Sequence, residues 1–117
     1  MKLITIINKS NNKIIGNKIA HANNFVTRFF GLMGKKALNE EEGLLITPCN
    51  SIHMMFMKFP LDIIFLDKQF KIVYVIESLK PWRVSPVIFK AQSVIELPEG
   101  TISRSESKVD DTLEIEQ

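Results

Sequence analysis

The sequence predicts a strand-rich α+β fold, in which about seven short strands form a curled sheet or partly open barrel with one short helix. Short runs of β-branched and aromatic residues alternate with turn residues, whereas only one stretch shows helical spacing. The chain is 45% hydrophobic and 24% charged, values typical of a globular domain. At 117 residues its length suits one folding unit, so we expect residues 1–117 to form a single domain.

The first part of the chain predicts a hairpin followed by the helix. Residues 3–7 are rich in Ile and Leu, the Asn-rich cluster 8–13 is typical of a turn, and Ile14 restarts an extended run. Residues 25–33 place Phe, Leu and Met at helical spacing behind a capping Asn. The polar stretch 35–43 is expected to be an exposed connection.

The central part predicts most of the core strands. Residues 44–46 form an apolar run before Pro48, and residues 52–59 form a second run rich in Met and Phe. The sequence LDIIFLDKQFKIVYVI, residues 61–76, predicts a hairpin of two strands around a turn at 67–69.

The last part predicts two further strands. Prolines at both ends of residues 81–86 remove backbone donors, which indicates a stiff loop that covers one end of the sheet. Residues 93–97 form a strand that stops at Pro98, and residues 112–115 supply an edge strand.

Charge and cysteine content restrict the partners and the compartment. The net charge is only +2 and the basic residues are scattered along the sequence, so we expect no nucleic-acid partner. The apolar run at the N-terminus is too short for a signal h-region or a membrane span, so we expect no membrane partner. The lone Cys49 closes no intrachain disulfide. We therefore expect a cytoplasmic protein.

The segment from Cys49 to Asp62 brings a thiol, an imidazole and a carboxylate within 14 residues. Cys49 and His53 could act as a thiolate–imidazole pair or bind a soft metal, but four strand positions span about 13 Å, so contact needs a sharp turn. We expect no metal and no cofactor, and a structural role for Cys49 as a small apolar residue. Asp62 either caps a turn by accepting backbone N–H bonds or serves as a base or polar anchor at a pocket mouth.

Three further residues lie later in the chain. Trp82 and Arg83 offer an indole beside a planar cation, which suits binding a carboxylate or stacking a ring, although both could simply anchor a loop. Strand alternation places Glu96 on the opposite face from Ile95 and Leu97, where we expect solvent exposure.

These residues support three hypotheses of function. The first is a small-ligand-binding module whose pocket recognises a small anionic or polar ligand. The pocket would be lined by His53, Asp62, Trp82, Arg83 and Glu96. The second is a small hydrolase or isomerase that uses Asp62, or His53 with Cys49. The third is a protein-interaction domain that uses a strand edge or an apolar helix surface. That helix surface would present Phe25, Phe29 and Phe30. The oligomeric state is left open.

Five blocks of sequence resemble one known family. They are TRFFGLMGKKAL (27–38), EGLLI (42–46), FPLDIIFLD (59–67), KPWR (80–83) and VIELPEGT (94–101). In this order the blocks resemble the DUF192 family, also called UPF0127, over about residues 20–115. The resemblance implies a small prokaryotic strand-rich α+β domain with no established activity, and no catalytic residue is inherited from it.

The resemblance also identifies recurrent family positions and two departures from them. The recurrent positions correspond to Arg28, Gly31, Leu32, Met33, Gly43, Pro60, Asp62, Glu96 and Gly100. The family often has an aromatic residue before Met where this chain has His53, which weakens a role for His53 as an essential base. A Gly-Asp pair is usual where this chain has Asp110 and Asp111, which puts the tight turn there in doubt.

Overall fold

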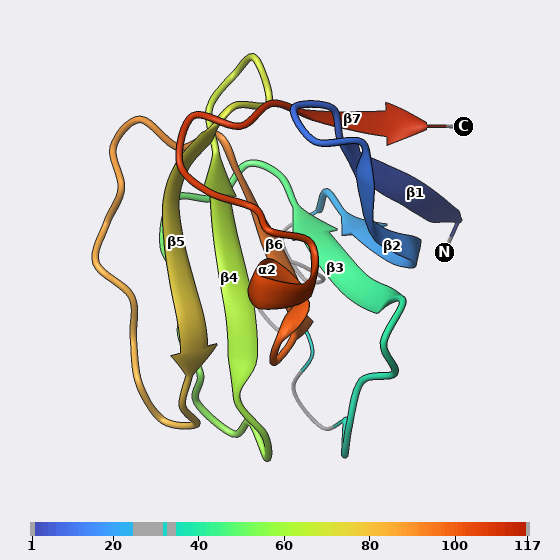
Figure 1. The fold of residues 1–117 in the computed structure, drawn as a ribbon. Coiled ribbons are helices and arrows are strands. Elements are labelled where there is room, and N and C mark those ends of the chain that lie inside the picture. The colour runs from blue at the N-terminus through green and yellow to red at the C-terminus, as the bar shows by residue number, and fades with distance from the viewer. Residues whose placement is uncertain (1, 25–31, 33–34, 117) are drawn as a thin grey trace.

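A computed structural model describes residues 2–24, 32 and 35–116 of the chain. They form a seven-stranded mixed sheet with strand order β5-β4-β6-β3-β2-β1-β7, accompanied by one short helix (Figure 1). In chain order the elements are β1 (Leu3–Asn8), β2 (Lys13–Ala22), β3 (Glu42–Ile46), β4 (Leu61–Leu66), β5 (Ile72–Leu79), β6 (Ser93–Pro98), α2 (Thr101–Arg104) and β7 (Leu113–Glu116).

Every neighbouring pair of strands is antiparallel except β2 and β3, which run parallel. Parallel neighbours need a long connection, and here it spans residues 23–41. The helix predicted at 25–33 falls in this connection and lies outside the described residues, apart from Leu32, which is buried.

The sheet curls until its two edge strands approach each other at one end. An isolated antiparallel bridge joins Lys71, just before β5, to Thr112, just before β7. The backbone N–H of Ile72 donates to Asp111 at 2.8 Å, and that of Leu113 donates to Phe70 at 2.9 Å. The sheet is not closed elsewhere, so the predicted curled, strand-rich α+β fold is confirmed.

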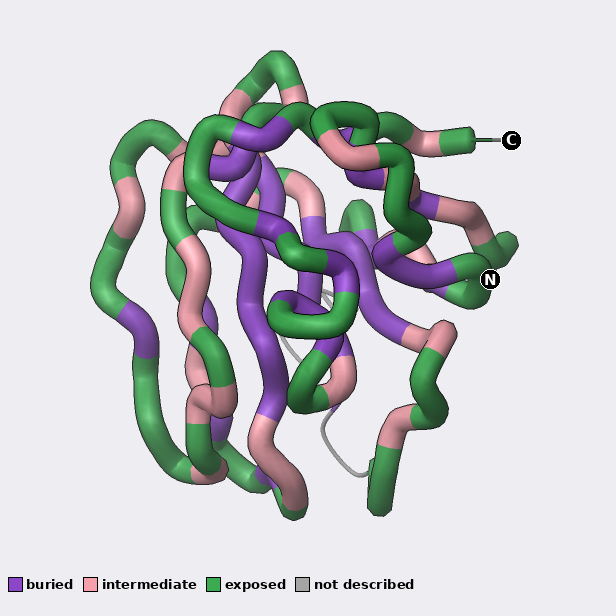
Figure 2. The backbone as a smooth tube through the Cα atoms, in the orientation of Figure 1, coloured by how far each residue is buried: buried purple, intermediate pink, exposed green. Residues whose placement is uncertain are grey.

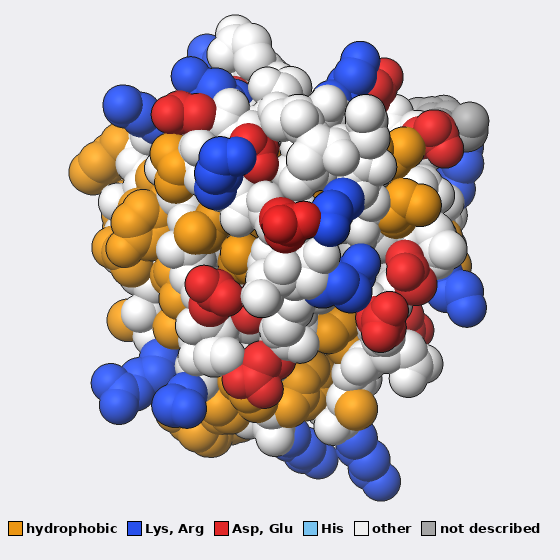
Figure 3. Space-filling model, viewed as in Figure 1, with side chains coloured by type: hydrophobic (Ala, Val, Ile, Leu, Met, Phe, Trp, Pro, Cys, Tyr) orange, Lys and Arg blue, Asp and Glu red, His pale blue; other side chains and the backbone are white. Residues whose placement is uncertain are grey.

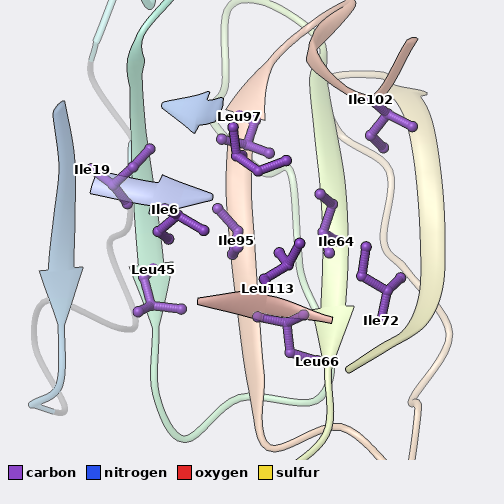
Figure 4. Packing of buried hydrophobic residues seen from close by; sticks show 11 residues of the cluster. Ile6, Ile19, Leu45, Ile64, Leu66, Ile72, Ile95, Leu97, Ile102 and Leu113 are labelled. Atoms are coloured by element: carbon purple, nitrogen blue, oxygen red, sulfur yellow. The ribbon is translucent and has the colours of Figure 1, made fainter. Parts of the chain in front are cut away.

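The sheet is buried on both faces. On the α2 side, alternate residues of the central strands pack into one core that includes Ile64, Ile95 and Leu97 (Figure 4). On the other side, Leu44, Ile63 and their neighbours pack under the connections before β3, before β4 and before β6. As a result β4 is buried along its whole length (Figure 2).

The hairpin predicted at 61–76 is confirmed as β4 and β5, which pair in antiparallel register around a tight turn. Asp67 fixes this turn, because its Oδ1 accepts the backbone N–H of Gln69 and of Lys71, both at 2.9 Å.

Residues 52–59 do not form the strand predicted for them. Only His53 makes a ladder contact, an isolated bridge to Val84, and Phe56 adopts a positive φ of 64° that ends the extended run. The segment pairs irregularly with residues 82–88 instead of joining the sheet. Its buried residues, Ile52, Met54 and Met57, nevertheless belong to the core, which explains the apolar run.

Helix α2 was not predicted, because four residues are too few to show helical periodicity. It begins after Gly100, whose φ of 95° is open to glycine at no steric cost. No helix in the described ranges is long and apolar enough to cross a membrane.

The tight turn before β7 is retained although Asp110 stands where the family usually has Gly. Asp110 adopts a φ of 80°, and its N–H donates to the carbonyl of Ile72 at 2.8 Å. The next residue, Asp111, is buried and accepts hydrogen bonds from the Asn8 amide and the Lys108 backbone N–H. Burial opposes its ionisation, but these bonds hold the pKa of Asp111 below its ordinary value.

We expect Asp110→Gly to stabilise the protein by about 0.5–1 kcal/mol, because Gly relieves the cost of a positive φ. The exposed ion pair with Lys71, at 3.9 Å, contributes little against this gain. Urea unfolding at neutral pH measures the change. Asp110→Ala, which keeps a Cβ at the same φ, should destabilise. A Gly variant less stable than the Ala variant would contradict the proposed cost.

Candidate functional site

The five residues singled out from the sequence do not line one pocket. Asp62 on β4 faces the α2 side of the sheet, since its neighbours Leu61 and Ile63 face the other core. Glu96 on β6 lies on that other face, opposite Ile95 and Leu97. His53, Trp82 and Arg83 lie outside the sheet, in the connections before β4 and before β6.

Asp62 is a buried anchor for three backbone segments. Its side chain is fully buried; Oδ1 accepts the N–H of Ser78 at 3.0 Å, and Oδ2 accepts those of Gly100 at 3.1 Å and Ile102 at 2.8 Å. These bonds tie β4 to the end of β5 and to the start of α2. The interpretation that Asp62 accepts backbone N–H bonds is confirmed, and both oxygens are already engaged rather than open to a substrate.

Glu96 is also buried, at 5% exposure, so the expectation that it faces solvent is wrong. Strand alternation correctly turned it away from Ile95 and Leu97, but the second face of the sheet is covered as well. Its direct neighbours across the ladders are Leu44 on β3 and Ile63 on β4, both apolar. Within the described part of the chain, its Oε1 is buried without a hydrogen-bond partner.

This setting changes the charge state of Glu96. Loss of solvation in the apolar core raises the pKa of the carboxyl to about 8 from 4.5. Glu96 is therefore mostly a neutral carboxylic acid at pH 7, able to donate one hydrogen bond and to accept others. A buried polar oxygen with no partner requires an explanation, because such groups are ordinarily satisfied by protein, water or ligand.

Two adjoining hollows lie at the end of β6 that follows Glu96, at Pro98 and Glu99. One, of about 240 Å³, is lined by Ala37, Leu38, Phe59, Pro60, Pro98 and Glu99. The other, of about 290 Å³, shares Leu38, Pro98 and Glu99 and extends to Gly100 and Arg104. Pro98 is two residues from Glu96 on the same strand face, a separation of roughly 7 Å.

His53, Trp82 and Arg83 are brought together by backbone pairing between residues 52–56 and 82–85. The N–H of Met54 donates to the Arg83 carbonyl at 2.7 Å, and the N–H of Trp82 donates to the Met54 carbonyl at 2.8 Å. Trp82 and Phe56 both adopt positive φ and pack edge to face, with ring centroids 4.8 Å apart. Three of the five predicted residues thus share one surface, away from Asp62.

Cys49 is half-buried, and its thiol donates to the Ser51 carbonyl at 3.1 Å. It lines a separate hollow of about 230 Å³ with Pro48, Asn50, Ala91 and Gln92. Among the residues described, no three His, Cys, Asp or Glu side chains are grouped so that they could hold a metal ion.

Sequence reasoning missed the walls of the hollows beside Glu96. Pro98 is interpreted from the sequence only as the end of a strand, yet Pro98 and Pro60 both line the hollow of about 240 Å³. Pro60 directly precedes β4, and Leu61 pairs with Pro98 on β6, so the two prolines are the sequence signal that could have indicated a shared rim.

We expect Asp62→Ala to lower the free energy of unfolding by at least about 3 kcal/mol, because three backbone donors lose their acceptor in a buried place. Urea unfolding measures the loss. Asp67→Ala is the matched control: it removes two backbone hydrogen bonds at an exposed turn and should cost less than half as much. Similar losses in both variants would show that burial does not set the cost.

The raised pKa of Glu96 predicts how stability changes with pH. Between about pH 4.5 and 8 the unfolded chain has an ionised Glu96 while the folded protein keeps it protonated, so the folded state binds the extra proton. The contribution of protonated Glu96 to the free energy of unfolding is fully present below pH 4.5. It is lost as the pH rises through 8, with a slope of up to about 1.4 kcal/mol per pH unit.

Glu96→Gln removes this titration and keeps the shape of the side chain. The stability of the variant relative to the parent protein should therefore rise steadily from pH 5 to pH 8, as measured by urea unfolding at each pH. Glu77→Gln, at an exposed position of β5, is the control for the substitution itself. Parallel curves for Glu96→Gln and the parent protein would contradict the assignment.

Comparisons with known proteins place the chain in a family. Residues 5–115 match the model of the DUF192 family, whose description reads "Uncharacterized ACR". A UPF0127 protein of Pyrococcus horikoshii is 37% identical over 100 residues, which cover 81% of this chain and 84% of the relative. A UPF0127 protein of Pyrococcus furiosus is 32% identical over 114 residues, covering 93% and 96% respectively.

Solved structures show the same fold. A crystal structure of a protein of unknown function from Novosphingobium aromaticivorans aligns with a TM-score of 0.82 at 23% identity, covering 95% of this chain and 82% of that one. A putative transcription regulator from Sinorhizobium meliloti aligns with a TM-score of 0.81, also at 23% identity, covering 96% and 91%. The matched model and the curated relatives together show that this chain belongs to the DUF192 family of UPF0127 proteins.

Proposed function

We propose that the protein is a small-ligand-binding module whose ligand has an apolar body and a single hydrogen-bond donor, an amine or a hydroxyl, directed at Glu96. The observation that supports this most strongly is the buried Oε1 of Glu96, which has no partner among the described residues. A donor placed there would satisfy a group that is otherwise costly to bury.

The surroundings of Glu96 support an apolar body for the ligand. Leu44 and Ile63 flank the carboxyl across the sheet, and Leu38, Phe59 and Pro98 line the neighbouring hollow. A ligand seated in the hollow would have to extend past Pro98 by roughly 7 Å to reach Glu96. Since Oε1 is sealed from solvent, binding also requires a local opening of this face.

An anionic ligand, the other class expected from the sequence, is less well supported at this place. Arg83, the residue expected to hold it, is exposed on the paired segment outside the sheet. The hollow itself adds a second acid, Glu99. A carboxylate or phosphate would lie beside the Glu99 side chain there, which disfavours it, while the mostly protonated Glu96 offers it no cation.

The hydrolase or isomerase hypothesis has weaker support than binding. Asp62, one of its two candidate bases, already accepts three backbone hydrogen bonds. A general base needs to reach the proton that it removes.

A cytoplasmic location remains part of the proposal, because the single Cys49 provides no disulfide for an oxidising compartment.

Titration of straight-chain amines, alcohols and carboxylates of matched length tests the proposal by thermal shift and calorimetry. We expect the amines or alcohols to raise the melting temperature and the carboxylates to have no effect, and we expect Glu96→Leu, which removes the acceptor oxygens, to abolish the shift. Glu77→Gln is the control that should keep it. Equal shifts in both variants, or a response to carboxylates alone, would contradict the proposal.

Calorimetry also distinguishes the two donors. An ammonium that binds Glu96 at pH 7 ionises the carboxyl, so binding should release up to about one proton per ligand, detectable as a dependence of the heat on the buffer. A hydroxyl leaves Glu96 protonated and releases none.

A further inference from the structure

The connections before β4 and before β6 form a surface of unusual composition, here named the paired ribbon and defined as residues 47–60 and 80–92. These residues include no Asp or Glu, although the whole chain has 13. They include four of its 15 basic residues. The ribbon therefore carries +4, whereas the remainder has 11 basic and 13 acidic residues and carries −2.

Backbone pairing joins the two segments, so Lys58 of the first segment belongs to one ribbon with the three cations of the second. His53 bridges Val84, the N–H of Ser85 donates to the Ile52 carbonyl at 2.8 Å, and that of Ile88 donates to Asn50 at 2.9 Å. All four cations of the ribbon are exposed. They are Lys58, Lys80, Arg83 and Lys90.

The ribbon also exposes large apolar side chains. Phe89 is 89% exposed and Trp82 is 60% exposed. The full set is Met55, Phe56, Trp82, Val84, Val87 and Phe89. Along the edge of the molecule beyond β5, hydrophobic side chains cluster with cations above and below them (Figure 3). Residues 82–89 alone extend over roughly 20 Å.

We propose that the paired ribbon docks the protein on the surface of an anionic lipid bilayer. Aromatic and aliphatic side chains enter the headgroup boundary while the surrounding Lys and Arg pair with lipid headgroups. The proposal departs from the expectation of no membrane partner, which rested on the short apolar run at the N-terminus. It is independent of the ligand proposed for Glu96.

The chemistry of the ribbon favours lipid over other polyanions. Single-stranded nucleic acid is bound by aromatic faces on which bases stack. Here Phe56 and Trp82 pack edge to face, and the exposed valines have no ring, so Phe89 is the one remaining exposed ring of the ribbon. A folded protein partner is typically held by pockets that receive its anchor residues. The large exposed side chains of the ribbon, from Met55 to Phe89, line none of the three hollows described above, whereas a bilayer adapts to protruding side chains.

The chain contains its own probe, because Trp82 is its one tryptophan. We expect the emission of Trp82 to shift to the blue with phosphatidylcholine vesicles that contain phosphatidylglycerol, and not with phosphatidylcholine alone. The shift should weaken as salt is added, because screening reduces the attraction of exposed charges. Co-sedimentation with the same vesicles measures the partition coefficient.

Matched variants separate the contributions of charge and apolar surface. Each of Lys80→Gln, Arg83→Gln and Lys90→Gln should lower partition onto anionic vesicles about fivefold, and Phe89→Ser should lower it further. Lys18→Gln on β2 and Val109→Ser before β7 remove an exposed cation and an exposed apolar residue elsewhere, and they should leave partition unchanged. An unchanged melting temperature in each variant shows that folding is intact.

Three outcomes would overturn the proposal. The first is an equal partition coefficient on neutral and anionic vesicles. The others are an equal loss of partition in the ribbon variants and in Lys18→Gln, and the absence of a blue shift of Trp82 emission on anionic vesicles. A Trp82 shift with single-stranded DNA or an acidic protein at concentrations where vesicles give none would reassign the surface to that partner.

Discussion

Burial of the sheet on both faces is the constraint on which the rest of this structure depends. All six residues of β4 are buried, as are the first five of β6, so a polar side chain in either strand reaches water from neither side. Asp62 and Glu96 meet this constraint with opposite results. Burial of the Asp62 carboxylate is tolerated because three backbone N–H groups donate to it in place of water. These hydrogen bonds also hold β5 and α2 against the sheet. Glu96 has apolar neighbours and one carboxyl oxygen with no hydrogen-bond partner among the described residues, and it retains its proton instead.

The same constraint explains how much of the fold the sequence could predict. Strands buried on both faces appear as continuous apolar runs, so LDIIFL at 61–66 and SVIEL at 93–97 were identified without any knowledge of their partners. The turn at Asp67 was readable because its chemistry is local. Residues 52–59 gave the same apolar signal but pack as an irregular segment against the sheet. Apolar content shows that a segment is buried, whereas its place inside or on top of the sheet is decided by distant pairing with residues 82–88.

The candidate site was harder to predict for the same reason. Alternation along β6 correctly gave the face on which Glu96 lies. Whether that face meets solvent depends on segments far away in sequence, and these segments cover it. His53, Trp82 and Arg83 could be selected as reactive residue types, but their common surface arises from the pairing of two loops about 30 residues apart. The cations of the paired ribbon also appear scattered in the sequence, and they belong to one surface only in the folded protein.

The two proposed activities meet on one side of the sheet. The paired ribbon presents Phe89 and Trp82 outward, while its inner residues Ile52, Met54 and Met57 pack in the core that also contains Leu44 and Ile63, the neighbours of Glu96. A ligand with an apolar body and one donor is the kind of molecule that concentrates in a bilayer interface. Docking and ligand binding thus use different groups, the exposed side chains of the ribbon and the buried carboxyl of Glu96, over one shared core.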